Sequence, residues 1–525
     1  MQRDTRNVQR ETYNVKRATC NVAFLLAVLL ASGVVGAADA HAQPDAHAQP
    51  LEAQQRADEE RLNVLWIVAE DLGTDLARAR TSHLDRLARQ GTRFTRAFAA
   101  APACSPSRSA LITGVPPTRL GPGVLHHRPP DSLKAPLPDE VRPLTDLMRD
   151  AGYFTANVRD LPGTDVRGTG KNDWNFAYDG RPFDTDQWRA LAQNQPFFAQ
   201  VNLPETHRPW DTGSPVDPLR VSVPPYVPDH PVTRADWAGY LGEVARLDEK
   251  VGAILNRLDA DGLAENTVVF FFADHGRPML RAKQWTHDAG LRVPLIVRWP
   301  GEEASGKPSW YAPGQATGRL TSLIDLAPTA LALAGADVPD GMAGRSLREG
   351  GDGTPARRYV FGAAGRSGGV DIRSRTARSK HFRYIRNDGP RTPHRAASAY
   401  RRSLYPSYHL VGKLHEEGRL TPAERLLGEP RPAEALYDLR SDPHELHNLA
   451  SSPAHRDRLE RMRRALRDWT RRNEAAAPEP PALARFFETY RERTSRYYAD
   501  RIERLRRRVY RADSTYVRAM RRLGE

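Results

Sequence analysis

One stretch of the chain, CSPSRSALITG from Cys104 to Gly114, combines a thiol with a cation. Its residues predict a short helix: Ser105 can cap the first turn, Pro106 fits inside it, and Gly114 can end it. Cys104 and Arg108 then lie on one side of this helix, one turn apart, at its N-terminus. Free backbone N–H groups and a guanidinium favour an anion there and stabilise a thiolate. The pattern indicates an anion site with a nucleophile, or alternatively a small cysteine buried in the core.

A second set of reactive side chains follows two apolar runs. NVLWIVA ends in Glu70 and Asp71, and TVVFFFA ends in Asp274 and His275. Such continuous β-branched and aromatic runs are typical of strands buried on both faces of a mostly parallel sheet. Ligand sites of these sheets lie beyond the carboxyl ends of the strands, so we expect the four side chains to meet there. Three carboxylates suit a hard divalent cation.

Alternating strands and helices would position these residues. Further strands are predicted within 196–207 and 293–299, and helices that close on a glycine within 82–91 and 235–262. The proline-rich stretch 208–233 is interpreted as a long loop near the same sheet edge. The alternation predicts an α/β fold, with a mostly parallel sheet flanked by helices.

The chain is longer than a single hydrophobic core usually allows. We therefore expect a catalytic domain over 61–350 and a smaller C-terminal α+β subdomain over 351–480. Within the subdomain, 384–430 is polar and predicted to be irregular, and 434–450 is interpreted as a strand, a turn and a helix start. The tail, 481–525, spaces its apolar side chains three to four residues apart, which predicts one or two amphipathic helices.

Positive charge is concentrated in this tail. The chain has a net charge of +14, and residues 485–525 alone hold thirteen Arg against six Asp and Glu. The apolar face of the tail is expected to pack against the body of the protein, with binding of a partner or polyanion as the alternative. The remaining basic excess fits a polyanionic substrate or an anionic surface, or is ordinary solvated charge. No nucleic-acid recognition motif is present, so no nucleic-acid partner is expected.

The N-terminus has the features of an export signal. A basic region precedes the apolar run NVAFLLAVLLASGVVGAA, and an AHA tripeptide ends at Ala42. We predict a signal peptide over 1–42, a flexible linker over 43–60, and a periplasmic or secreted protein that has no membrane anchor after cleavage. An uncleaved anchor is the alternative. Cys20 would leave with the signal peptide, so Cys104 would be the one cysteine of the mature chain.

Together, these motifs resemble the type I sulfatases. CSPSR matches the Cys-x-Pro-Ser-Arg signature of that family and is followed by its Leu-x-Thr-Gly. Other matching segments occur in the family's order: NVLWIVAEDLG, NTVVFFFADHG, GLRVPLIVRWPG and LYDLRSDPHELHNLA. The resemblance covers most of the chain. It implies an alkaline-phosphatase-like fold and an enzyme that hydrolyses sulfuric esters or sulfamates.

In this family a maturation enzyme oxidises the signature cysteine to Cα-formylglycine. The resemblance implies this fate for Cys104, whose hydrated aldehyde would supply one hydroxyl to attack sulfur and a second to expel sulfate. It also implies a divalent metal, calcium in most members, held by Glu70, Asp71, Asp274, His275 and Cys104. Glu70 stands where Asp is commoner in the family, and His275 is a less typical ligand for calcium.

Three further positions match functional residues of the family. The resemblance implies that Lys171 and Lys283 act on the sulfate together with Arg108, and that His207 assists departure of the leaving group. Lys171 lies in GTGKNDWNF, where the family motif Gly-Lys-x-His has a histidine in place of Asp173. No catalytic role is therefore assigned to Asp173.

Within the family, the chain is most similar to the N-sulfoglucosamine sulfohydrolase branch. The segments that carry this similarity are VPPYVPDHPVTRADWAGYLGEVARLDEKVG, GKNDWNFAYD and DHGRPMLRAKQW. They imply a sulfated saccharide substrate, with N- or O-sulfated glucosamine of heparan-type glycans as the expectation. Two alternatives stay open. One is a phosphatase, phosphodiesterase or phosphonate hydrolase of the same superfamily, against which the complete signature argues; the other is a non-catalytic sulfoglycan-binding protein with Cys104 unmodified.

Overall fold

The structure is a computed structural model that describes residues 61–210, 216–301, 307–348, 357–389, 391–474 and 478–523. The signal peptide and linker expected over 1–60 lie outside these residues. Within them, no helix has both the length and the apolar character needed to cross a membrane.

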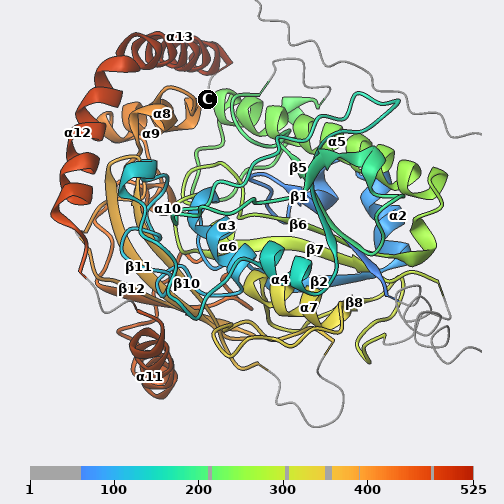
Figure 1. Ribbon diagram of the computed structural model, residues 1–525. Helices are drawn as coiled ribbons and strands as arrows, with labels where there is room; N and C mark the ends of the chain where they lie inside the picture. Colours follow the sequence, from blue (N-terminus) through green and yellow to red (C-terminus); the bar gives the residue numbers. More distant parts are fainter. Residues whose placement is uncertain are drawn as a thin grey trace, which may run out of the picture. The chain divides into compact units, whose positions relative to one another are not determined.

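A nine-stranded mixed sheet forms the centre of the described chain (Figure 1). Its strands are β1 (Asn63–Ala69), β2 (Thr92–Phe98), β3 (Phe154–Asp160), β4 (Thr185–Gln187), β5 (Phe197–Leu203), β6 (Thr267–Ala273), β7 (Arg292–Arg298), β8 (Ala316–Thr317) and β9 (Thr321–Ser322). Their order is β4-β3-β5-β1-β6-β7-β2-β8, and β9 also pairs with β2. Strand β7 is antiparallel to β6 and β2, and the other pairs are parallel. The predicted mostly parallel sheet is confirmed.

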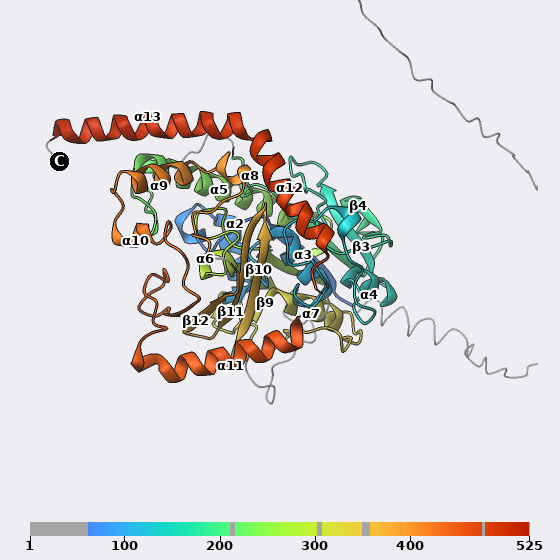
Figure 2. The same cartoon turned by 90° about the vertical axis from the view of Figure 1, so that its left-hand side faces the viewer.

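The central strands are apolar because helices cover both faces of the sheet. Every residue of β1, β5 and β6 is buried, and the Trp66 ring meets Phe198 and Phe272 edge-on at centroid distances of 4.9 and 5.6 Å. The main flanking helices are α2 (Ser82–Gln90), α3 (Cys104–Thr113), α4 (Leu144–Asp150), α5 (Pro231–Ala260) and α7 (Leu326–Leu333). Helices α2 and α5 pack together on one face, and α3, α4 and α7 on the other (Figures 1 and 2).

Helix α3 begins two residues earlier than a Ser105 cap would place it. Its N-cap is Ala103, which has no side chain to cap with, and Cys104 is the first helical residue. The Ser105 hydroxyl instead accepts a hydrogen bond from the backbone N–H of Arg128, at 3.0 Å. The predicted end is confirmed: Gly114 has φ 66°, a left-handed conformation that costs glycine little.

A smaller antiparallel sheet follows the main one. It consists of β10 (Val360–Ser367), β11 (Val370–Arg378), β12 (Phe382–Asn387) and β13 (Glu434–Asp438), paired in that order. Helix α11 (Arg456–Asn473) covers this sheet, and its Trp469 stacks on Phe361 with the ring centroids 5.1 Å apart. The expected α+β character of this part is confirmed.

Two local predictions in this part are wrong. The stretch predicted to be irregular contains α8 (Ala399–Arg402), α9 (Pro406–Glu416) and α10 (Pro422–Arg425). Helix α9 forms because its buried Leu410, Val411 and Leu414 pack on a distant part of the chain. The helix start expected before residue 450 is instead a turn, because the Asp442 carboxylate accepts the backbone N–H groups of Leu446 and His447.

The tail forms two helices, α12 (Pro481–Tyr497) and α13 (Ala499–Leu523). Helix α13 lies along α9 and α5, and its far end extends past the neighbouring elements (Figure 2). Val509 of α13 packs in one cluster with the buried leucines of α9. Beside it the buried Asp513 carboxylate pairs with Lys413 at 2.8 Å and Arg419 at 3.0 Å. The prediction that the apolar face packs against the body is confirmed.

Candidate active site

The predicted carboxylates meet at the carboxyl ends of two adjacent parallel strands. Ala69 of β1 and Ala273 of β6 are partners in the sheet, so the residues that follow them lie side by side. Oδ1 of Asp274 accepts the backbone N–H of Asp71 at 3.0 Å and that of His275 at 2.9 Å. Asp71 has φ 58°, so the chain turns sharply where its side chain enters the site.

Four side chains here could hold a cation. Their ligand atoms all lie within 4.8 Å of one another, and all four are buried: Asp71, Cys104, Asp274 and His275. His275 Nδ1 lies 2.9 Å from the Gly276 carbonyl oxygen, which leaves Nε2 facing the group when Nδ1 carries the proton. Despite burial, Asp274 and Cys104 raise the pKa of His275 to about 10. Several anionic groups in one buried space fit a divalent cation.

Glu70 is not one of the four side chains grouped by this distance, and its assignment as a metal ligand stays a prediction. Its Oε2 accepts a hydrogen bond from Lys171 Nζ at 3.0 Å, and its Oε1 lies 3.8 Å from Arg108 Nη2. In this position the Glu70 carboxylate neutralises and orients the side chains of Lys171 and Arg108.

Cys104 is the first residue of α3 and lies close to Lys283. Its Sγ is 3.2 Å from His275 Nε2, 3.4 Å from Lys283 Nζ and 3.6 Å from Asp71 Oδ1. Burial works to raise the pKa of the Cys104 thiol, but Lys171 and Lys283 outweigh it and lower that pKa to about 6. The position thus stabilises an anion, as the sequence predicts.

Arg108 is held by two of its three guanidinium nitrogens. Nε donates to Asp274 Oδ2 at 3.1 Å, and Nη1 donates to Asn202 Oδ1 at 2.6 Å. Nη2 is buried and has no hydrogen-bond acceptor among the described residues. A buried N–H without an acceptor is costly, so this nitrogen is suited to an oxygen of an anionic ligand.

The two lysines and His207 complete the arrangement. Lys283 Nζ lies 2.6 Å from both oxygens of Asp71, and Lys171 lies 3.5 Å from Asp173. His207 Nε2 is 4.0 Å from Asp71 Oδ2, and the Asp71 carboxylate raises the pKa of His207. The His207 side chain is 29% exposed, whereas that of Asp71 is buried, so His207 stands at the opening of the site.

The structure brings together all the predicted site residues, and it adds several that sequence analysis missed. Asn202 interrupts an apolar strand, a signal that could have singled it out. His127 lies with Nδ1 3.1 Å from Ser105 Oγ, and burial lowers its pKa. Arg401 arrives on α8, buried, where the charges of Asp71 and Cys104 act on its pKa. Nothing local in the sequence marks Arg401.

Residues 62–336, which are more than half of the chain, match the sequence profile of the Sulfatase family. The chain belongs to the sulfatase family. An ulvan-active sulfatase of Formosa agariphila is 30% identical over 468 residues, which cover 78% of this chain and 75% of that protein. Human N-sulphoglucosamine sulphohydrolase is 28% identical over 465 residues, which cover 78% of this chain and 89% of that enzyme. The resemblance seen in the sequence is therefore confirmed, and this sulfatase is an enzyme.

The fold agrees with this membership. A solved structure described as a 2-O GAG sulfatase matches this sulfatase with a TM-score of 0.55 at 20% sequence identity. The match covers 81% of this chain and 96% of that one. At this identity it shows the shared fold alone, which is the sheet flanked by helices and the smaller antiparallel sheet.

Proposed function

We propose that this sulfatase releases inorganic sulfate from a sulfated saccharide, with Cys104 converted to Cα-formylglycine. The observation that carries the proposal is Arg108 Nη2, a buried donor with no hydrogen-bond acceptor among the described residues, on the helix that begins with Cys104, whose thiol pKa is lowered by Lys171 and Lys283. The names of the relatives, an ulvan-active sulfatase and N-sulphoglucosamine sulphohydrolase, support a saccharide substrate.

In this proposal Asp71, Asp274, His275 and the oxidised side chain at 104 hold a divalent cation, for which calcium is the candidate. Such a cation supplies charge neutralisation and polarises sulfate oxygens. The two carboxylates of Asp71 and Asp274, and the His275 imidazole with Nε2 facing them, are suited to hold such a cation. Lys283 binds both oxygens of Asp71 and thereby orients that ligand.

The chain's own cations hold the sulfate. Arg108 offers Nη2 to one sulfate oxygen, while its bonds to Asp274 and Asn202 keep the guanidinium plane fixed. Lys283 Nζ lies 3.4 Å from Cys104 Sγ, and the charges of Lys171 and Lys283 both act on that side chain. These groups are in place before the reaction, so they stabilise the charge that develops on the transferring sulfuryl group without further reorganisation.

The reaction proceeds in two displacements. In the first, one hydroxyl of the hydrated formylglycine attacks sulfur and loses its proton. The bond from sulfur to the saccharide then breaks, and His207 donates a proton to the departing oxygen or nitrogen. The second hydroxyl then loses its proton, the bond from the formylglycine carbon to the sulfate oxygen breaks, and the aldehyde re-forms. Water restores the hydrate, so the balance is one water consumed for each sulfate released.

The substrate proposed is an N- or O-sulfated glucosamine of a heparan-type glycan. It rests on the similarity to N-sulphoglucosamine sulphohydrolase and on the excess of basic residues. The second candidate is a phosphonate or phosphate ester hydrolase of the same superfamily. A binding protein with unmodified Cys104 is the third.

The test is sulfate release from a panel of N-, 2-O-, 3-O- and 6-O-sulfated glucosamines, together with a phosphonate monoester. We expect turnover of one or more sulfated sugars and its loss in Cys104→Ala. The mass of the Cys104 peptide should fall by about 18 Da, as sulfur is replaced by oxygen with loss of two hydrogens. An unmodified thiol with full activity, or equal activity in Cys104→Ala, would refute the mechanism.

We also propose that the protein is exported and that a formylglycine-generating enzyme acts on it. The support is the sequence pattern before Ala42 and the CSPSR signature. N-terminal sequencing of protein from the periplasm or medium tests the first point, with residue 43 as the expected new N-terminus. Full-length protein retained in the membrane fraction would contradict it.

A further inference from the structure

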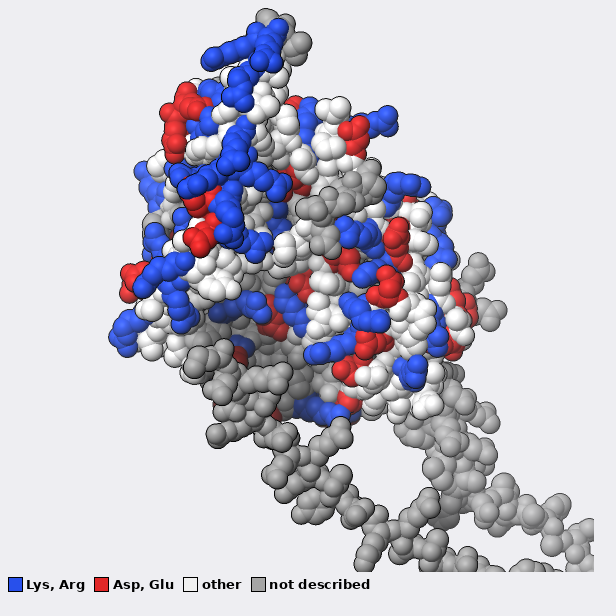
Figure 3. Space-filling view, turned by 90° about the horizontal axis from the view of Figure 1, so that it is seen from above, with Lys and Arg blue, Asp and Glu red and all other residues white. Residues whose placement is uncertain are grey.

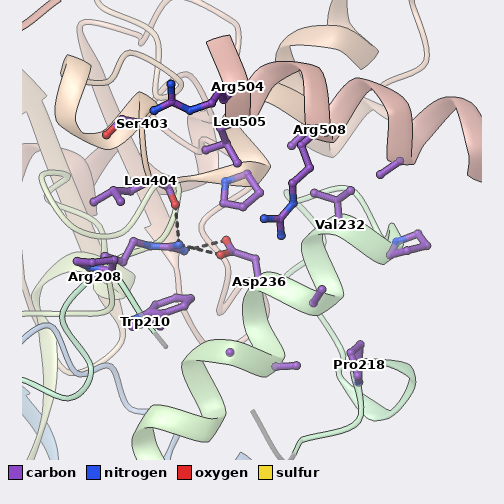
Figure 4. Close-up of a pocket in the computed structure, with 18 of the residues that line it drawn as sticks. Arg208, Trp210, Pro218, Val232, Asp236, Ser403, Leu404, Arg504, Leu505 and Arg508 are labelled. Carbon is purple, nitrogen blue, oxygen red and sulfur yellow. Dashed lines mark hydrogen bonds and ion pairs between the residues drawn. The ribbon is translucent and has the colours of Figure 1, made fainter. Parts of the chain in front are cut away.

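Beneath the C-terminal helix lies a groove that the proposed reaction does not use. Its volume is about 780 Å³, and α13 forms one wall while the segment 208–210 and the start of α5 form the other (Figure 4). The segment 403–406, which connects α8 to α9, closes one side. Residues from three distant parts of the sequence therefore build it.

The wall that α13 contributes is basic. Three of its arginines line the groove: Arg501, Arg504 and Arg508. Their side chains are exposed and make no hydrogen bond or ion pair with any described residue. Two other arginines of α13 are engaged, since Arg506 and Arg507 lie 2.8 and 2.7 Å from Glu503. In Figure 4, Arg508 reaches into the groove and Arg504 extends along its rim.

No free carboxylate offsets these charges among the described lining residues. Asp236 is the acid of the lining, and both of its oxygens are bound by Arg208, at 2.7 and 2.8 Å. Its side chain is 4% exposed. The groove consequently presents a net positive charge to a ligand.

The opposite wall is aromatic and apolar. Trp210 is half-buried, and the Arg208 guanidinium lies over its ring at 3.8 Å from the centroid. Pro209, Pro218 and Val232 extend this surface. A surface with flat apolar rings on one side and cations on the other matches a sulfated sugar chain, which has apolar ring faces and charged sulfate groups.

The groove adjoins the active site. Arg208 follows His207 directly, and its guanidinium lies 4.2 Å from the centroid of the Tyr405 ring. Tyr405 in turn is close enough to Lys283 and Asp71 for their charges to act on its pKa. Arg208 therefore lines the groove directly beside His207 in the chain, and it also packs on Tyr405.

We propose that the groove is a second binding site, which holds a segment of a sulfated polysaccharide away from the sugar being desulfated. Arg501 and Arg508 are about 10 Å apart along the helix axis, roughly the length of two linked sugar rings. Lys and Arg side chains also gather elsewhere along α13 (Figure 3), but the proposal assigns binding of the polysaccharide to the arginines that line the groove. This proposal rests on the proposed function for its substrate class, and it adds that long chains are bound better than single sugars.

The test compares two triple variants of the full-length protein that lose the same charge. The groove variant is Arg501→Gln with Arg504→Gln and Arg508→Gln; the control is Arg507→Gln with Arg518→Gln and Arg521→Gln, exposed arginines of the same helix that do not line the groove. Affinity for size-fractionated heparan sulfate is measured by calorimetry at fixed salt. Sulfate release is measured with the polymer and with the sulfated monosaccharide, and circular dichroism checks the helix.

We expect the groove variant to bind the polymer about tenfold more weakly than the control variant, since three exposed ion pairs with sulfate groups would be lost and each contributes only a small factor. The ratio of polymer to monosaccharide kcat/KM should fall by a similar factor. Equal weakening in both triples would overturn the proposal, because it would show a general charge effect. So would selective loss of binding to vesicles of anionic phospholipid with polymer binding intact. If wild type releases no sulfate, the proposed function fails, while calorimetry still decides on the groove.

Discussion

The replacement Arg108→Lys separates positive charge from hydrogen-bond geometry at the proposed sulfate site. Arg108 uses Nε for Asp274 and Nη1 for Asn202, which leaves Nη2 for a ligand. A lysine has one nitrogen, so it keeps the charge but cannot make these contacts together. At least one charge-assisted hydrogen bond to sulfate is lost, which amounts to about 1.5–3 kcal/mol.

A loss of that size in the transition state corresponds to a fall in kcat/KM of about 10- to 150-fold. The assay is sulfate release, normalised to the fraction of protein that carries formylglycine, because Arg108 is also part of the signature in which Cys104 is modified. The mass of the Cys104 peptide gives that fraction. The matched control is Arg119→Lys, an arginine 3.3 Å from Glu140 at the surface.

We expect the Arg119→Lys control to stay within about twofold of wild type, because exposed pairs contribute little. The reasoning is refuted if Arg108→Lys, corrected for modification, retains kcat/KM within about threefold of wild type. A fall that the modified fraction accounts for completely would likewise assign Arg108 to maturation and not to catalysis.

Three other outcomes are expected. Asp513→Asn should destabilise the protein by about 2–4 kcal/mol in urea unfolding, since Lys413 and Arg419 lose their buried partner. Burial raises the pKa of Asp513, but those two cations outweigh it and hold that pKa below the ordinary value. The difference in unfolding free energy between wild type and Asp513→Asn should therefore be complete above about pH 4 and vanish at lower pH. A difference that is constant with pH would contradict this. Arg401→Gln should raise KM by about tenfold with less effect on kcat, if this buried arginine contacts the sulfated sugar; a change in kcat alone would argue against contact. Calcium added after chelation should raise the unfolding free energy by about 2.7 kcal/mol at a hundredfold excess over Kd, and Asp274→Asn should abolish that gain. Equal stabilisation of wild type and Asp274→Asn would refute the site.

Much of the active site could be predicted because its signals are local. A strand buried on both faces must be apolar along its length, so polar residues directly after it stand out, as Glu70, Asp71, Asp274 and His275 do. The helix start at Cys104 is also marked locally, by Pro106 and by the glycine that ends the helix. The wrong Ser105 cap shows the limit of such signals, since the hydroxyl found a partner more than twenty residues away.

The sequence by itself determined the family, the sheet and which residues meet at the sheet's carboxyl edge. Only the tertiary structure decided that Glu70 pairs with Lys171, that the charges of Asp71 and Cys104 act on the buried Arg401, and that α9 is helical. Each of these depends on contacts between segments far apart in the chain, which no local pattern encodes. The basic tail illustrates this: its spacing predicts helices, but its docking along α9 forms the groove at which its free arginines gather.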